Sequence, residues 1–154
     1  MYPTDLSDVL SSMGYVLDAH YVLSGNPPEI TQWTPPLGEA DPYWPDGPSP
    51  EQVAAYLTGP EYLGLRKRQL IADLDAERLP RLDAVGWTNA ARMDAALGLP
   101  TLAYQAHHLA ESRAVAEAYQ AAADAVTATA DVAAAEVAAA AVQWPTLTGP
   151  EGAA

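Results

Sequence analysis

The chain has 154 residues, a formal net charge of −13 and no cysteine. Its length suits one domain with a core, or a small body with long appendages. The acidic balance makes nucleic-acid backbones and anionic membranes poor general partners, because neither would gain counterion release from this surface. The lack of cysteine excludes disulfides, thiolate catalysis and Cys-ligated metals.

Charge is unevenly distributed along the chain. All basic residues lie between Arg66 and Arg113, so that residues 1–65 contain nine acidic and no basic residues and residues 114–154 contain five acidic and no basic residues. Attraction between the acidic flanks and the middle is therefore expected, within a chain or between subunits. The alternative interpretation is that the flanks only keep an alanine-rich chain soluble.

The first 25 residues are predicted to form an N-terminal helix. No basic and apolar leader segment is present, so we expect no export signal. Apolar residues at helical spacing predict a helix over about residues 5–23, with Thr4 as a candidate N-cap, weakened by Gly14 and ended by Ser24–Pro28.

Residues 26–50 are predicted to form an irregular arm. They contain eight of the fourteen prolines, which neither a helix nor a central strand tolerates, together with Trp33, Tyr43 and Trp44. The aromatic residues argue against a free linker. Two alternatives stay open: the arm docks on a neighbouring subunit through Trp33 and Trp44, or it folds back over its own helices.

Residues 51–144 are predicted to form a helical body. Ser49, Pro50 and Gln52 form a capping-box pattern before a short helix that ends at Thr58-Gly59. Further helices are expected from Pro60 to Leu79, where Pro80 should break the pattern, and over about residues 88–97, with Thr88 as N-cap and Gly98 at the end.

The most distinctive predicted element is one long helix over residues 100–143, which has 19 alanines between Leu102 and Gln143. Polar and acidic residues interrupt its apolar run, which rules out a membrane span. Its acidic residues recur on one side, and the other side is apolar. Because alanine buries little area, this apolar side should need other helices for stability. The apolar side consists of Val115, Tyr119, Val126 and Val137.

A short C-terminal tail, residues 145–154, follows the long helix. Trp144 precedes it and could fill a pocket on a partner, although a packing role is the commoner one for tryptophan. Leu57-Thr58-Gly59-Pro60-Glu61 recurs in this tail as residues 147–151, but the flanking sequences do not match, so the repeat is not a domain duplication.

Few residues suggest chemistry. Arg66, Lys67 and Arg68 form the basic cluster, which fans around a helix and suits a solvated face or a docking point for an acidic flank, including the arm of a next copy, better than a nucleic-acid groove. His107, His108 and Glu111 resemble a metal-ligand grouping but lack a fourth ligand, and ordinary surface roles are favoured. No catalytic constellation is recognisable. We therefore expect no enzymatic activity, metal or cofactor.

The predicted fold class is mainly α: a helical body with one long Ala-rich helix, a Pro/Trp-rich extended arm and a short tail. This layout in an acidic chain without cysteine resembles the head-to-tail connector or adaptor proteins of tailed bacteriophages. The resemblance implies a non-enzymatic structural subunit of a symmetric ring, located in the virion, whose partners are copies of itself and neighbouring structural proteins. The alternative is a cellular, cytoplasmic helical binding or regulatory module whose arm docks on a specific partner.

Overall fold

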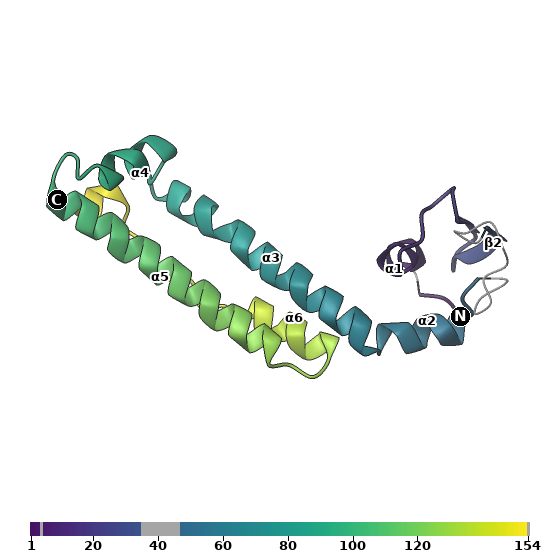
Figure 1. The fold of residues 1–154 in the computed structure, drawn as a ribbon. Helices are drawn as coiled ribbons and strands as arrows, with labels where there is room; N and C mark the ends of the chain where they lie inside the picture. Colours follow the sequence, from purple (N-terminus) through teal and green to yellow (C-terminus); the bar gives the residue numbers. More distant parts are fainter. Residues whose placement is uncertain (4, 35–46, 154) are drawn as a thin grey trace. The chain divides into compact units, whose positions relative to one another are not determined.

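A computed structural model describes residues 1–3, 5–34 and 47–153. The fold is mainly α-helical, as predicted, and its strands within the described residues form one two-stranded sheet (Figure 1). The chain divides into two compact units, Met1–Leu65 and Arg66–Ala154. The acidic N-terminal flank therefore coincides with the first unit, and every basic residue belongs to the second.

The first unit begins with a helix that is much shorter than predicted. Helix α1 spans only Leu6–Ser12, and the expected helix over residues 5–23 is wrong beyond this point. Gly14 adopts a φ of 94°, which ends the helix, and Asp18 follows with a φ of 62°. The chain then forms strand β1, Tyr21–Ser24. The apolar residues that we assigned to one helix therefore lie partly in α1 and partly in β1.

Part of the predicted arm is also regular. Strand β2, Glu29–Trp33, pairs antiparallel with β1, with an irregularity between Val22 and Leu23. Prolines flank this strand without interrupting it, so a two-stranded hairpin forms where we expected irregular chain. The remainder of the arm, residues 35–46, including Trp44, lies outside the described residues.

The core of the first unit joins α1 to the hairpin and to helix α2. Helix α2, Pro50–Leu57, has the predicted capping box: Ser49 Oγ accepts from the Gln52 backbone amide, and the Gln52 side chain accepts from the Ser49 amide. Trp33 packs against this core with its ring 4.7 Å from that of Tyr15. The buried core residues are Leu6, Val9, Leu10, Tyr15, Tyr21 and Val53.

Two long helices that lie side by side form most of the second unit, and the first of them begins in the first unit, at Pro60. Helix α3, Pro60–Ala84, and helix α5, Leu102–Thr127, are joined through helix α4, Asn89–Ala96 (Figure 1). Thr88 caps α4 as predicted by accepting from the Ala91 amide. Helix α3 continues through Pro80, where we expected it to end, because Leu82 in its last turn packs against Trp87 in the core.

The predicted helix over residues 100–143 is in fact two helices. Helix α5 ends at Thr127, and helix α6, Val132–Ala140, folds back beside it. Asp131 caps α6 by accepting from the Ala134 amide, and Thr129 Oγ1 donates to the Val126 carbonyl at the end of α5. Local side-chain bonds to the backbone therefore compete with the helix at these positions, although the segment contains neither Gly nor Pro.

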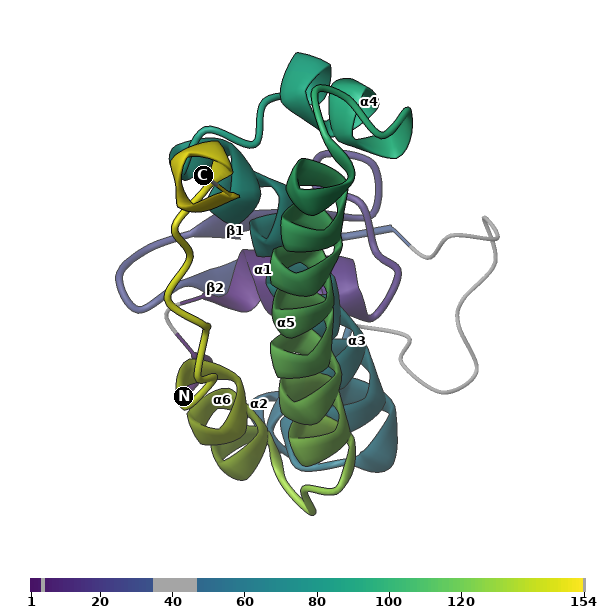
Figure 2. The same cartoon turned by 90° about the vertical axis from the view of Figure 1, so that its left-hand side faces the viewer.

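Two hydrophobic clusters hold α3 against α5. One gathers Leu74, Ala122, Val126 and Ala135, and the other gathers Leu82, Trp87, Ala95 and Val115. The C-terminal segment then returns on the same side of α5 as α6 and ends in a short 3-10 helix, η1, Pro150–Ala153 (Figure 2). Trp144, at the start of this segment, packs against both clusters.

Candidate functional site

A buried carboxylate on α5 is the centre of the polar network in the second unit. Glu111 is only 8% exposed. Its Oε2 accepts from Trp87 Nε1 at 2.6 Å and from the Gly149 amide at 3.1 Å. Its Oε1 accepts from the Thr148 amide at 2.6 Å and from Thr148 Oγ1 at 2.9 Å. Each carboxylate oxygen thus has two donors, which satisfies a charge that burial would otherwise destabilise.

These hydrogen bonds decide the ionisation of Glu111. Burial acts to raise the pKa of its carboxyl group, but the bonds from Thr148, Trp87 and Gly149 together outweigh it, so that the pKa lies below the ordinary value of 4.5. Glu111 is therefore a carboxylate at neutral pH, and its role is to anchor the C-terminal segment to α5.

The segment that binds Glu111 belongs to the repeated pentapeptide. Gly149 has a φ of 69°, and a Cβ atom there would lie 1.9 Å from the Val85 carbonyl oxygen, so only glycine fits. In the first occurrence the threonine acts differently: Thr58 Oγ1 donates back to the carbonyls of Ala54 and Ala55 at the end of α2. The repeated sequence therefore serves two unrelated turns.

Both histidines of the suggested metal grouping have other roles. His107 Nε2 lies 3.0 Å from the Gly149 carbonyl oxygen and 3.6 Å from Glu111 Oε1. His108 Nε2 lies 3.2 Å from Ser112 Oγ, and burial together with the nearby Arg92 charge lowers the pKa of His108, against the opposing effect of Glu111. No group of three potential metal ligands occurs within the described ranges.

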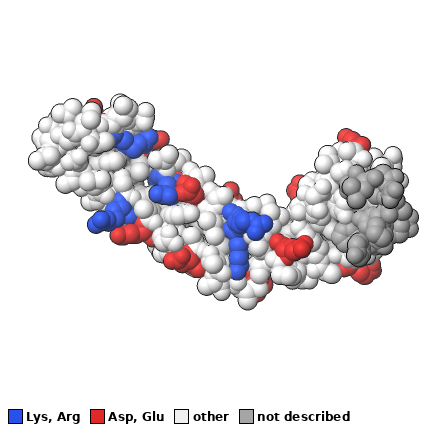
Figure 3. All heavy atoms as spheres, in the orientation of Figure 1, with Lys and Arg blue, Asp and Glu red and all other residues white. Residues whose placement is uncertain are grey.

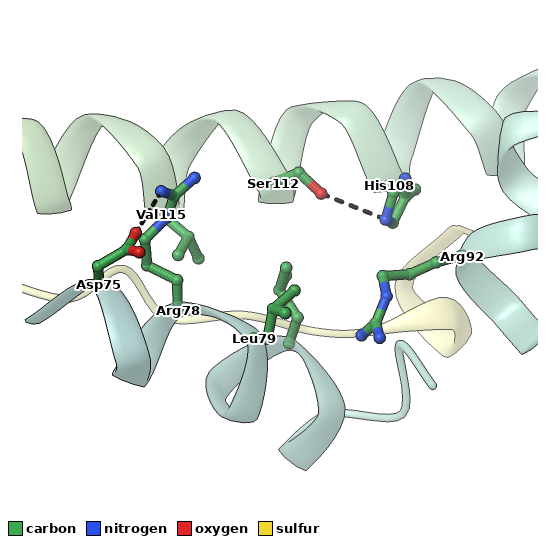
Figure 4. Close-up of a pocket in the computed structure, with 8 residues that line it drawn as sticks. Asp75, Arg78, Leu79, Arg92, His108, Ser112 and Val115 are labelled. Carbon is green, nitrogen blue, oxygen red and sulfur yellow. Dashed lines mark hydrogen bonds and ion pairs between the residues drawn. The ribbon is translucent and has the colours of Figure 1, made fainter. Parts of the chain in front are cut away.

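A pocket of about 390 Å³ lies between α3, α4 and α5 (Figure 4). Leu79, Leu82 and Val115 supply apolar lining, and Arg78, Arg92 and His108 supply polar lining. The two guanidinium groups already have partners, because Arg78 pairs with Asp75 and Arg92 pairs with Asp83. The pocket can therefore accept an apolar group with a polar edge, but it does not present an unpaired positive charge.

The apolar face predicted on the long helix is largely internal. Val115 and Val126 are buried, and Tyr119 packs against Leu74 of α3 together with the Arg78 guanidinium, which lies 4.9 Å from its ring centre. We expected this apolar side to need other helices for stability, and α3, which is of comparable length, packs against it. Val137 lies on α6 and is 70% exposed, so it does not belong to the same face.

Trp33 and Trp144, predicted as interface anchors, both pack within their own units. Trp33 contacts Tyr15 in the first core. Trp144 lies beneath Arg81, whose guanidinium carbon is 4.4 Å from the ring centre. For these two residues the packing interpretation describes the contacts that the structure contains.

The basic cluster is used inside the second unit. Arg66 pairs with Glu136 at 2.7 Å, a contact between the basic middle and the acidic C-terminal flank. Lys67 Nζ donates to the carbonyls of Thr127 and Thr129 and so caps the end of α5. Arg68 is exposed. Figure 3 shows Lys and Arg interspersed with Asp and Glu on the visible face, which does not resemble a continuous phosphate-binding stripe.

A different surface has the character of an interface. Four leucines around the α4–α5 turn and along α5 are more than half exposed: Leu97, Leu99, Leu102 and Leu109. We call these four residues the leucine surface. We did not predict this surface from the sequence, although Leu102 and Leu109 are seven residues apart on α5, on the side away from Val115.

Comparisons with protein-family models, curated proteins and solved structures gave no match to this chain. None of the helices described is both long and apolar enough to cross a bilayer.

Proposed function

We propose that the protein is a non-enzymatic structural subunit of a symmetric assembly. The observation that carries this proposal is the leucine surface, where Leu97 and Leu102 are 73% and 76% exposed. Scattered exposed leucines are ordinary, but several together on one end of a unit are typical of a surface that binds protein. Homo-oligomers are the commonest form of such association.

The specific form that we propose is a head-to-tail connector ring of a tailed bacteriophage virion. Its support is the resemblance in layout of a mainly helical, acidic chain without cysteine; the single long helix that also carried the resemblance is divided into α5 and α6. The unequal charges of the two units also favour ordered contacts between subunits, because the first unit contains only acidic residues among its charged side chains and all basic ones lie in the second.

Light scattering of the purified full chain over about a hundredfold range of concentration tests the general proposal. A mass that rises above that of one chain supports a self-assembling subunit, and electron microscopy of the assembled species tests whether it is a ring. A single-chain mass throughout the range, with or without neighbouring virion proteins, contradicts the proposal.

The second candidate function is a helical binding module that captures another protein without assembling with itself. The pocket between α3, α4 and α5 favours it, because Leu79, Leu82 and Val115 could receive one apolar side chain of a partner. Replacing Leu79 with Asp should then abolish partner binding while the mass of the isolated protein remains that of one chain.

A further inference from the structure

The leucine surface is continuous from the α4–α5 turn onto α5. Gly98 lies between Leu97 and Leu99, and a Cβ atom there would be 3.5 Å from Leu102 Cδ2, so the leucines of the turn adjoin the first leucine of α5. Beyond Leu102, the same side of the helix presents Ala106 and Leu109. A shallow hollow of about 600 Å³, lined in part by Ala106 and Leu109, continues this surface.

Unpaired charges of opposite sign border the leucine surface at its two ends. Arg113 is one turn beyond Leu109, is exposed and lines the same hollow. Asp94 is exposed at the other end, and its carbonyl accepts from the Leu99 amide, which places it at the turn. Neither the Arg113 nor the Asp94 side chain has an ion pair within the described residues, and the same is true of Arg68. The other four arginines of this unit do form ion pairs: Arg66, Arg78, Arg81 and Arg92.

We propose that the leucine surface is a two-fold contact with a second copy of this chain, in which the two α5 helices run antiparallel. Leu102 of each copy then faces Leu109 of the other. Arg113 lies four residues beyond Leu109, and Gly98 lies four residues before Leu102. In this register Arg113 reaches the α4–α5 turn of the second copy, where Asp94 lies in the last turn of α4, so the proposed contact pairs Arg113 with that Asp94.

The register explains why a second copy fits better than an unrelated protein. A two-fold contact needs a surface that is complementary to itself, so each charged group must lie opposite a group of the other sign in the second copy. The positive charge at one end of the leucine surface and the negative charge at the other satisfy this condition twice.

This inference deepens the proposed function and rests on it, because it requires that the protein associates with itself. It also limits the symmetry of the assembly. A two-fold contact closes on a pair, so a larger ring needs a second surface to join the pairs.

Charge reversal tests the contact with the full chain. R113D places two acidic residues opposite each other at both ends of the contact, and D94R places two basic residues there. Each variant alone should self-associate about tenfold or more weakly than wild type, since each unfavourable pair occurs twice. When the two variants are mixed, both ends of the mixed pair regain an Arg–Asp pair, and association should return to near the wild-type level.

Apolar substitutions give an independent test. L102D and L109D should each weaken self-association, whereas V137D, an equally exposed apolar position on α6, should not. Circular dichroism must show the same helix content in all variants, as expected for exposed positions. Light scattering and sedimentation give the association constants.

The outcomes separate this inference from the proposed function. Wild-type protein that remains a single chain overturns both. Wild-type protein that associates with unchanged strength in L102D, L109D and R113D overturns the two-fold contact and leaves the structural role standing. Weakened single variants whose mixture does not recover overturn the antiparallel register, because a two-fold pairing of Arg113 with Asp94 requires recovery.

Discussion

Replacing Glu111 with Gln should strongly destabilise the second unit, although the two side chains have nearly the same shape. In the native structure each carboxylate oxygen accepts two hydrogen bonds, from Trp87 and Gly149 on one and from the Thr148 amide and hydroxyl on the other. In glutamine one oxygen becomes an NH₂ group. The two buried donors that bonded to that oxygen then face the NH₂ group, which is itself a donor, and have no acceptor.

The expected effect can be estimated from those two lost acceptors. A buried donor left without a partner costs about 1–3 kcal/mol. The free energy of unfolding should therefore fall by roughly 2–4 kcal/mol, since adjacent losses are not fully additive. Urea denaturation followed by circular dichroism at 222 nm, the usual helix wavelength, measures this change. Glu117→Gln is the matched control, because Glu117 lies on the same helix and is exposed; it should change stability by less than about 0.5 kcal/mol.

The difference in stability between wild type and Glu111→Gln should depend on pH in a defined way. The pKa of Glu111 is lowered in the folded protein, so its carboxylate stabilises the fold fully above the unfolded value near 4.5, and this contribution is lost as pH falls through the folded pKa. The difference in stability between wild type and Glu111→Gln should thus be constant near neutral pH and shrink below about pH 4.5. A difference of less than about 0.5 kcal/mol at neutral pH would show that the network does not stabilise the fold.

Other substitutions test the packing of the second unit. Val126→Asp should lower the free energy of unfolding by about 3 kcal/mol or more, because it places a charge in the fully buried contact between α5 and α3. Asp124→Ala, on the exposed side of α5, should change the stability measured in urea by less than about 0.5 kcal/mol. Equal effects of the two substitutions would reject the assigned faces. Gly149→Ala should lower the melting temperature and expose the C-terminal segment to protease, since the added methyl group would overlap the Val85 carbonyl; an unchanged cleavage rate would show that this turn has freedom to move.

Sequence reasoning predicted the features that local chemistry specifies. The capping box at Ser49 and the N-cap at Thr88 depend on a few neighbouring residues, and both occur as predicted. The hairpin in the first unit was missed because the spacing of Leu17 and Tyr21 also fits a helix, and only packing of Tyr21 into the core distinguishes the two. Local periodicity does not contain that information.

The candidate site was predictable only in fragments. Glu111 was noted beside His107 and His108, and the pentapeptide at 147–151 was noted as a repeat, but nothing local connects residues that are 37 positions apart. The break at Ala128–Asp131 was hidden for a related reason. The segment has no Gly or Pro, and the capping bonds of Thr129 and Asp131 gain their advantage only because α6 can then pack against α5.

The polar contacts of the second unit explain how an alanine-rich hairpin can have one register. Small apolar side chains pack with little direction, so sliding α5 along α3 by one turn would exchange one alanine contact for a similar one. Lys67 binds the carbonyls of Thr127 and Thr129 at one end of α5, and Glu111 binds the C-terminal segment toward the other. These two contacts are about 24 Å apart along the helix. A shift by one turn, about 5.4 Å, would separate the buried Glu111 carboxylate from Trp87 Nε1, which follows α3, and Lys67 of α3 from the carbonyls at the end of α5, and the apolar packing would not replace these contacts.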